Sequence, residues 1–198
     1  PGAGVGVAFD GTGVNLLGGT NIGTDNNVIG ALDTAVICIG SNGVDIFGNY
    51  IGVQDDGATA IPNGVGVALV NGAVNTLVGN SGGSAFNVIS GNFNEGVLIM
   101  DPGTDGNTVQ ENIIGLDGSG AFPVSNNAGV IIASGAANNS IGPYNVISGN
   151  ALEGLLLRDP GTSGNAVFGN FIGVDGSGNS APGTGNIAGI RLDNSVSG

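Results

Sequence analysis

The 198-residue chain contains 42 glycines, 40% apolar residues and 9% charged residues, and its 15 acids face two arginines and no lysine or histidine, so that its net charge is −13. The apolar content excludes a disordered Gly/Ser linker, and the negative charge disfavours nucleic acid and anionic membrane surfaces as partners. No apolar run approaches the ~20 residues of a membrane span, so we expect no membrane insertion.

The N-terminal part of the chain predicts two coils of short β-strands. Gly6 begins an aliphatic segment, and Ala35 begins a second one that contains Cys38. Because Cys38 is the only cysteine, the chain can form no internal disulfide, and its apolar neighbours indicate a small buried side chain. Each segment is followed by a second short strand that begins with an asparagine, Asn27 in the first coil and Asn49 in the second.

The same pattern returns along the rest of the chain. Each coil begins at a small residue that is followed by aliphatic residues. These first residues are Gly6, Ala35, Gly66, Gly96, Gly129, Gly154 and Gly189. Such self-similarity is the signature of a solenoid. We therefore predict one domain, residues 1–198, built from three double-coil repeats of about 60 residues and a partial fourth, with the approximate bounds 1–61, 62–124, 125–181 and 182–198.

The apolar runs predict an all-β right-handed parallel β-helix of about six coils. They are too short for helices, rich in β-branched residues and bounded by the turn formers Gly, Asn and Asp. An antiparallel sandwich is the main alternative, but it does not require turn residues to recur in register. Asn recurs because it tolerates left-handed turns and because its amide can bond to the amide one coil away. The expected inward residues are Val97, Ile99, Val130, Ile132, Leu155 and Leu157.

Two recurring motifs resemble those of a known group of proteins. The segments 87–92 (Asn-Val-Ile-Ser-Gly-Asn) and 169–173 (Gly-Asn-Phe-Ile-Gly) look like the parallel β-helix repeats of bacterial exported and cell-surface proteins. More distantly they are similar to the pectate-lyase-like superfamily. The resemblance covers essentially the whole chain and implies the fold, but the superfamily contains lyases, hydrolases, phage tailspikes, adhesins and passive stalks.

Paired carboxylates are the first candidates for catalysis, since glycosidases use them as acid and base. The candidates are Asp101, Asp105, Asp159, Glu95 and Glu153. However, Asp101-Pro-Gly-Thr recurs at Asp159, which indicates a turn in which the Asp bonds its own backbone. Arg158 is expected to project outward and offset Asp159. The resemblance implies that a lyase of this fold needs a basic residue and often calcium. We therefore assign no catalytic residue and predict that the chain is not an enzyme.

Metal and ligand sites are likewise not predicted. Asp117 and Asp175 open Asp-Gly-x-Gly loops that can ligate calcium, but they are expected two coils apart, about 10 Å, too far to share an ion. No metal and no cofactor is therefore assigned. The aromatic residues fall beside strands or turns, where we expect core or capping roles; a cleft lined by non-repeated acids and aromatics would instead indicate carbohydrate binding.

The leading hypothesis is an extracellular or cell-surface structural protein that forms or contributes to a fibre, stalk or adhesive surface. The regular repeats, the low charge and the two arginines as sole basic residues motivate it. Because the fourth copy resembles the first, head-to-tail self-association into a filament is expected. The alternatives are a carbohydrate-binding or carbohydrate-active β-helix, for which surface glycans would be partners, and a phage tail fibre.

Overall fold

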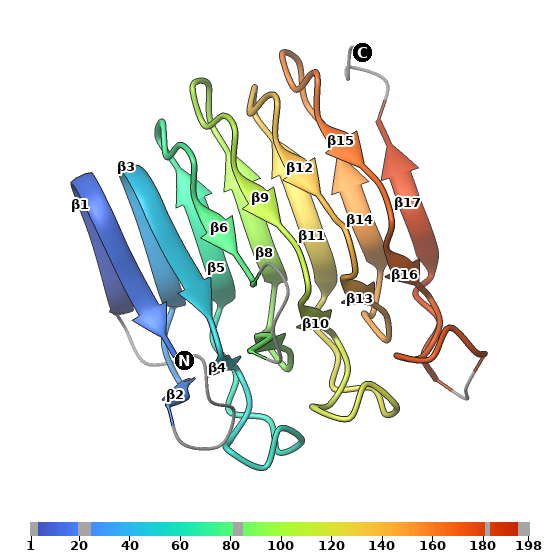
Figure 1. Ribbon diagram of the computed structural model, residues 1–198. Coiled ribbons are helices and arrows are strands. Elements are labelled where there is room, and N and C mark those ends of the chain that lie inside the picture. The colour runs from blue at the N-terminus through green and yellow to red at the C-terminus, as the bar shows by residue number, and fades with distance from the viewer. Residues whose placement is uncertain (1–3, 20–24, 81–84, 181–182, 194–198) are drawn as a thin grey trace.

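The chain is an all-β parallel solenoid, as the sequence predicts. The computed structural model describes residues 4–19, 25–80, 85–180 and 183–193. Strands of successive coils lie side by side from β1 to β17, and every strand pair is parallel (Figure 1). Residues 1–3 of the first predicted repeat, and Pro182 and residues 194–198 of the predicted fourth copy, lie outside the described residues.

Each coil passes through three faces. The first face contains β1 (Val5–Gly18), β3 (Thr34–Phe47), β5 (Val65–Val70), β8 (Glu95–Met100), β11 (Ala128–Ala133), β14 (Glu153–Leu157) and β17 (Ala188–Leu192). The long strands β1 and β3 continue into the second face, which is extended by β6 (Leu77–Val78), β9 (Thr108–Val109), β12 (Ser140–Ile141) and β15 (Ala166–Val167). The third face contains β2 (Asn27–Ile29), β4 (Asn49–Ile51), β7 (Val88–Ile89), β10 (Ile113–Ile114), β13 (Val146–Ile147) and β16 (Phe171–Ile172).

The predicted coil starts stack on one another on the first face. Val97 pairs with Val67 in the preceding coil and with Val130 in the following one, which places the glycines before them in one column. A Cβ on Gly96 would lie 2.8 Å from the carbonyl oxygen of Gly129. Glycine therefore recurs at this corner because the neighbouring backbone passes too close for a side chain.

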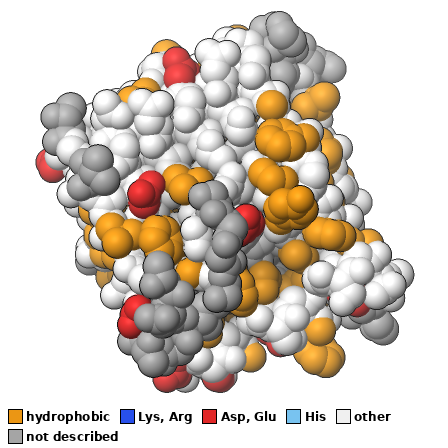
Figure 2. All heavy atoms as spheres, in the orientation of Figure 1, with side chains coloured by type: hydrophobic (Ala, Val, Ile, Leu, Met, Phe, Trp, Pro, Cys, Tyr) orange, Lys and Arg blue, Asp and Glu red, His pale blue; other side chains and the backbone are white. Residues whose placement is uncertain are grey.

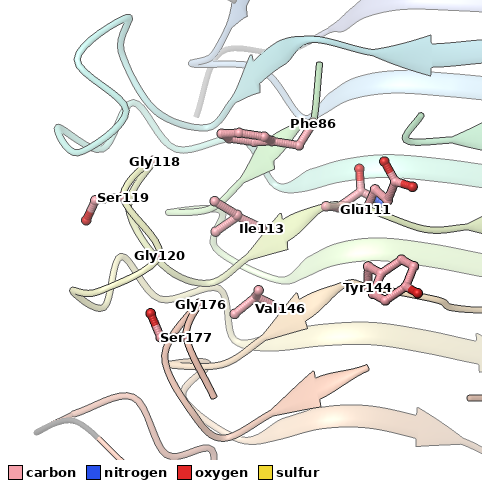
Figure 3. A pocket seen from close by; sticks show the side chains of 11 residues that line it. Phe86, Glu111, Ile113, Gly118, Ser119, Gly120, Tyr144, Val146, Gly176 and Ser177 are labelled. Atoms are coloured by element: carbon pink, nitrogen blue, oxygen red, sulfur yellow. The ribbon is translucent and has the colours of Figure 1, made fainter. Parts of the chain in front are cut away.

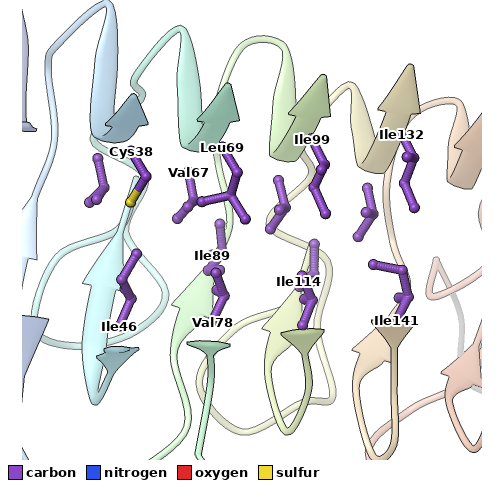
Figure 4. Packing of buried hydrophobic residues seen from close by; sticks show 14 of the residues in the cluster. Cys38, Ile46, Val67, Leu69, Val78, Ile89, Ile99, Ile114, Ile132 and Ile141 are labelled. Atoms are coloured by element: carbon purple, nitrogen blue, oxygen red, sulfur yellow. The ribbon is translucent and has the colours of Figure 1, made fainter. Parts of the chain in front are cut away.

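The core is a set of stacked aliphatic columns, and Figure 4 shows part of it. The six inward residues predicted on the first face are all buried. Opposite them, the third face contributes one isoleucine from every coil: Ile29, Ile51, Ile89, Ile114, Ile147 and Ile172. Since each of these residues contacts its own counterpart one coil away, the repeat produces a continuous core.

Asparagine side chains, buried except toward the two ends, form ladders at the corners of the solenoid. The first ladder runs through all six coils, each Nδ2 donating to the next Oδ1 over 2.8–3.0 Å, and consists of Asn27, Asn49, Asn87, Asn112, Asn145 and Asn170. A second ladder consists of Asn63, Asn92, Asn126, Asn150 and Asn186. A third consists of Asn107, Asn139 and Asn165. The predicted amide-to-amide bonding is thus confirmed, whereas left-handed backbone belongs to other asparagines, Asn71, Asn75 and Asn138.

The outer surface carries few charges. Figure 2 shows acidic side chains scattered among apolar patches and uncharged atoms on one side of the molecule. On the outside of the first face, Ala68, Ile131 and Leu156 point away from the core, yet they are only 4%, 6% and 8% exposed. Ile131 and Leu156 pack with Ala128, Ala133, Leu98 and Met100 in a small outer cluster, and this packing buries residues that strand alternation alone would leave exposed.

Candidate functional site

Long loops fold back over the outside of the third face in every second coil. They follow β4, β10 and β16, and Figure 1 shows them projecting on one side of the solenoid. A Cβ on Gly57 would lie 3.4 Å from the ring of Tyr50, and one on Gly118 would lie 3.8 Å from Cγ2 of Val88. The loops therefore cover part of the apolar outer column of this face.

These loops also contact one another, which corrects the predicted separation of about 10 Å. The N–H of Gly118 donates to the carbonyl of Gly57 over 2.9 Å, and the N–H of Gly176 donates to that of Gly120 over 2.9 Å. Sequence spacing placed the loops two coils apart, but each loop is long enough to bridge that gap. The three loops thus form a continuous wall parallel to the solenoid axis.

An open pocket of about 340 Å³ lies between this wall and the third face, and we call it the side pocket (Figure 3). Its floor contains Ile113 and Val146. The loop wall contributes residues 118–120 and 176–177, including the hydroxyl groups of Ser119 and Ser177, and the opposite side consists of Phe86, Glu111, Asn112 and Tyr144. The pocket thus combines an apolar floor with a polar rim, an arrangement typical of small-ligand sites.

Glu111 and Tyr144 hold an unusual backbone conformation at this pocket. Both precede an asparagine of the first ladder and have φ of 52° and 63°, and in two of the other coils the same position is occupied by Gly48 and Gly169 with φ of 69° and 63°. Glycine adopts this region freely, whereas a residue with a Cβ loses about 1 kcal/mol or more there. Sequence reasoning missed Glu111, although a signal was visible: Glu111 is the one carboxylate at a position that holds Asn26, Gly48, Phe86, Tyr144 and Gly169 in the other coils.

The expectation that the aromatic residues serve the core or cap the ends is wrong for most of them. Tyr144 is 64% exposed, and the other aromatic residues more than one-third exposed are Phe93, Phe122, Phe168 and Phe171. Phe9 alone among the aromatics packs partly against the main core cluster. From the second coil on, the inward columns hold aliphatic residues and Cys38, so the other aromatic residues lie outside these columns.

The predicted candidate acids occupy structural positions away from the side pocket. Asp101 lies in a turn with φ of 82°, and its carboxylate accepts a hydrogen bond from the N–H of Asn71 in the preceding coil, at 3.2 Å. Asp105 accepts from the N–H of Ala137 at 3.1 Å. The prediction that Asp101 lies in a turn is confirmed. Its carboxylate, however, bonds to the N–H of Asn71 in the neighbouring coil and not to its own backbone, because the turns of the two coils are stacked.

The two arginines lie in ion pairs at the surface. Nε of Arg158 lies 3.9 Å from Asp159, with both side chains partly exposed, as predicted. Arg191 donates to Glu153 and to Asp193, both at 3.0 Å, and the bond to Glu153 is the main reason that its pKa is raised. Glu95 lies on β8, in register with Ala128. None of the five candidate acids lines the side pocket.

Acids of the long loops bind their own backbone. Partial burial acts to raise the pKa of Asp117, but hydrogen bonds from the N–H of Phe122, from Ser119 and from the N–H of Ala121 outweigh it, so that the pKa lies below its usual value. Asp175 accepts from the N–H groups of residues 177 and 179 in the same way. Within the described ranges, no three or more Asp, Glu, Cys or His side chains cluster as metal ligands would.

Cys38 is fully buried in the core, as predicted for a small apolar side chain. Burial raises the pKa of its thiol to about 11, against the opposing effect of the nearby hydroxyl groups of Ser41 and Thr76. Both hydroxyl groups are buried and have no hydrogen-bond partner of standard geometry. A thiol is only a weak hydrogen-bond partner for a hydroxyl group. The core therefore contains two buried hydroxyl groups, on Ser41 and Thr76, whose hydrogen bonding is poorly satisfied.

A scan against protein-family models, a search of curated proteins and a search of solved structures each gave no match for this chain. The described part of the chain contains no helix that is long and apolar enough to cross a membrane. Two surfaces of the solenoid are candidate sites: its end faces and the side pocket.

Proposed function

We propose that this chain is a structural β-solenoid that acts outside the cell as part of a fibre, stalk or adhesive surface. In this proposal the solenoid supplies rigidity and a long surface, and it grows by adding coils end to end. The distant kinship with the pectate-lyase-like superfamily belongs to the same proposal, and it is supported by parallel stacked coils alone.

The edge of β17 is the observation that carries the proposal. Ile190 and Leu192 continue the inward columns of Leu155 and Leu157, yet they are 51% and 64% exposed. An open parallel edge above an apolar column is a template for a further strand. Such a strand can come from a second copy or from additional residues of the same polypeptide.

The opposite end offers a matching surface. Gly6-Val7-Ala8-Phe9 of β1 has the same pattern as Gly189-Ile190-Arg191-Leu192 of β17, and Val7 and Phe9 pack only partly against the core. The asparagine ladders are directional as well, because in every amide-to-amide bond within them the Nδ2 donates to the Oδ1 of the following coil. A C-terminal edge therefore complements an N-terminal one, and a head-to-tail contact of this kind extends without closing.

Sedimentation and electron microscopy of the chain over a range of concentrations test the proposal. We expect rods longer than one solenoid, and we expect Ile190→Asp with Leu192→Asp to prevent their growth. Phe122→Asp is the matched control, because Phe122 is 69% exposed but lies on a lateral loop. A chain that stays monomeric at high concentration, or rods that persist in the double variant, would contradict end-to-end growth.

The proposal includes the absence of catalysis. We expect no cleavage of a broad panel of polysaccharides, with or without calcium, because the candidate acids Asp101 and Asp159 serve turns. Turnover that is abolished by Asp101→Ala, Asp159→Ala or Glu111→Gln would overturn it.

A further inference from the structure

We propose that the side pocket is a binding site for a neutral glycan chain, in which Tyr144 supplies a stacking surface for a sugar ring. The inference gives a site and a ligand class to the adhesive part of the proposed function, and it rests on that part only. Rod growth involves the end faces and does not require the pocket.

The backbone at the pocket is the first line of evidence. Nine non-glycine residues in the described part of the chain have left-handed φ, and six of them are Asn, Asp or Ser, whose short polar side chains suit this region: Asn71, Asn75, Asp101, Ser134, Asn138 and Asp159. The other three are Ala31, which lies outside the pocket, and Glu111 and Tyr144, which both line it. In two other coils glycine occupies the position equivalent to theirs, at Gly48 and Gly169. Stability would therefore be served better by glycine, and strain of this kind concentrates at functional sites.

The composition of the pocket indicates the class of ligand. A pyranose ring has an apolar face of C–H groups and a rim of hydroxyl groups. Ile113 and Val146 provide an apolar floor, Phe86 and Tyr144 provide ring surfaces, and Ser119 and Ser177 provide hydroxyl groups. The carboxylate of Glu111 has several acceptor sites for sugar hydroxyl groups in addition to any it already uses.

Charge and shape restrict the ligand further. The net charge of −13 repels uronate-rich or sulfated chains, and neither arginine lies in the pocket. The wall formed by the hydrogen-bonded loops runs along the axis, and the pocket is lined by residues of successive coils from Phe86 to Ser177, so its length follows the axis. A linear, uncharged polysaccharide fits these restrictions.

Isothermal titration with neutral hexasaccharides of glucose, mannose and xylose tests the inference. Oligogalacturonate and chitosan oligosaccharide serve as the anionic and cationic probes. We expect saturable binding of at least one neutral chain and about tenfold weaker binding by Tyr144→Gly, the loss of one aromatic contact. Tyr144→Gly keeps the backbone conformation of Gly169, so its melting temperature should stay within a few degrees of the wild-type value.

Phe122→Ala removes an equally exposed aromatic residue outside the pocket and should change the affinity by less than about twofold. The inference fails if no neutral hexasaccharide binds, if only a charged probe binds, or if Tyr144→Gly leaves the affinity unchanged. Sedimentation of the same samples separates the two proposals: rods without glycan binding defeat only the pocket, and glycan binding without rods defeats only end-to-end growth.

Discussion

The side-chain amide of Asn87 donates a hydrogen bond to Oδ1 of Asn112, 2.8 Å away and one coil further along the solenoid. Asn87 also donates to the carbonyl of Ile46 and accepts from the main-chain and side-chain nitrogens of Asn49. Both asparagines are buried. One side chain thus satisfies polar groups of the two neighbouring coils and links three coils together.

Asn87→Ala should therefore destabilise the chain by about 3 kcal/mol or more, because it leaves several buried groups without partners. Denaturant unfolding measures the change. Asn42→Ala is the matched control: its Oδ1 accepts from the amide of Asn75 at 3.0 Å, but this pair is exposed. We expect the control to cost less than about 0.5 kcal/mol, and equal losses in both variants would show that the ladder adds nothing special.

Ile132→Asp should be severely destabilising, by more than about 4 kcal/mol, because it places an unpaired carboxylate in the core. Ile132 is fully buried between Ile99 and Leu157. Ile39→Asp, at a side chain that is 39% exposed, should cost far less. Thermal unfolding compares the two, and an unchanged melting temperature for Ile132→Asp would refute the inward orientation.

Thr76→Val should stabilise the chain by about 1 kcal/mol, since it replaces a buried hydroxyl group that lacks a partner by a methyl group of similar size. The N–H of Thr76, which donates to Asn107, is unaffected by the change. Chemical denaturation gives the difference. A loss of stability would mean that the hydroxyl group has a favourable interaction with the thiol of Cys38.

Cys38 should make stability fall at alkaline pH. Its folded-state pKa of about 11 lies above the ordinary value of 9.0, so its contribution is complete below pH 9 and is lost as the pH rises toward 11. The loss is about 2–3 kcal/mol. Cys38→Val should lack this component, and unfolding curves of both proteins between pH 8 and 11 isolate it. Identical pH profiles would contradict the raised pKa.

The sequence by itself determined the solenoid and its internal order. The coil starts from Gly6 to Gly189, the inward phase of Val97 and Ile99, and the recurrence of asparagine at the corners were all predictable. The physical reason is that every coil packs on its own copy, so a local pattern repeated at a fixed spacing already specifies its long-range partners.

Only the tertiary structure decided the side pocket and the partners of the acids. Phe86, Glu111 and Tyr144 come from three coils and depart from the repeat, and the opposite wall exists because loops two coils apart bend toward each other and join through Gly57 and Gly118. The path of a loop depends on its contacts with other coils, and no local periodicity encodes those contacts. For the same reason the bond from Asn71 to Asp101, and the exposure of the aromatic residues, could not be read from their neighbours in sequence.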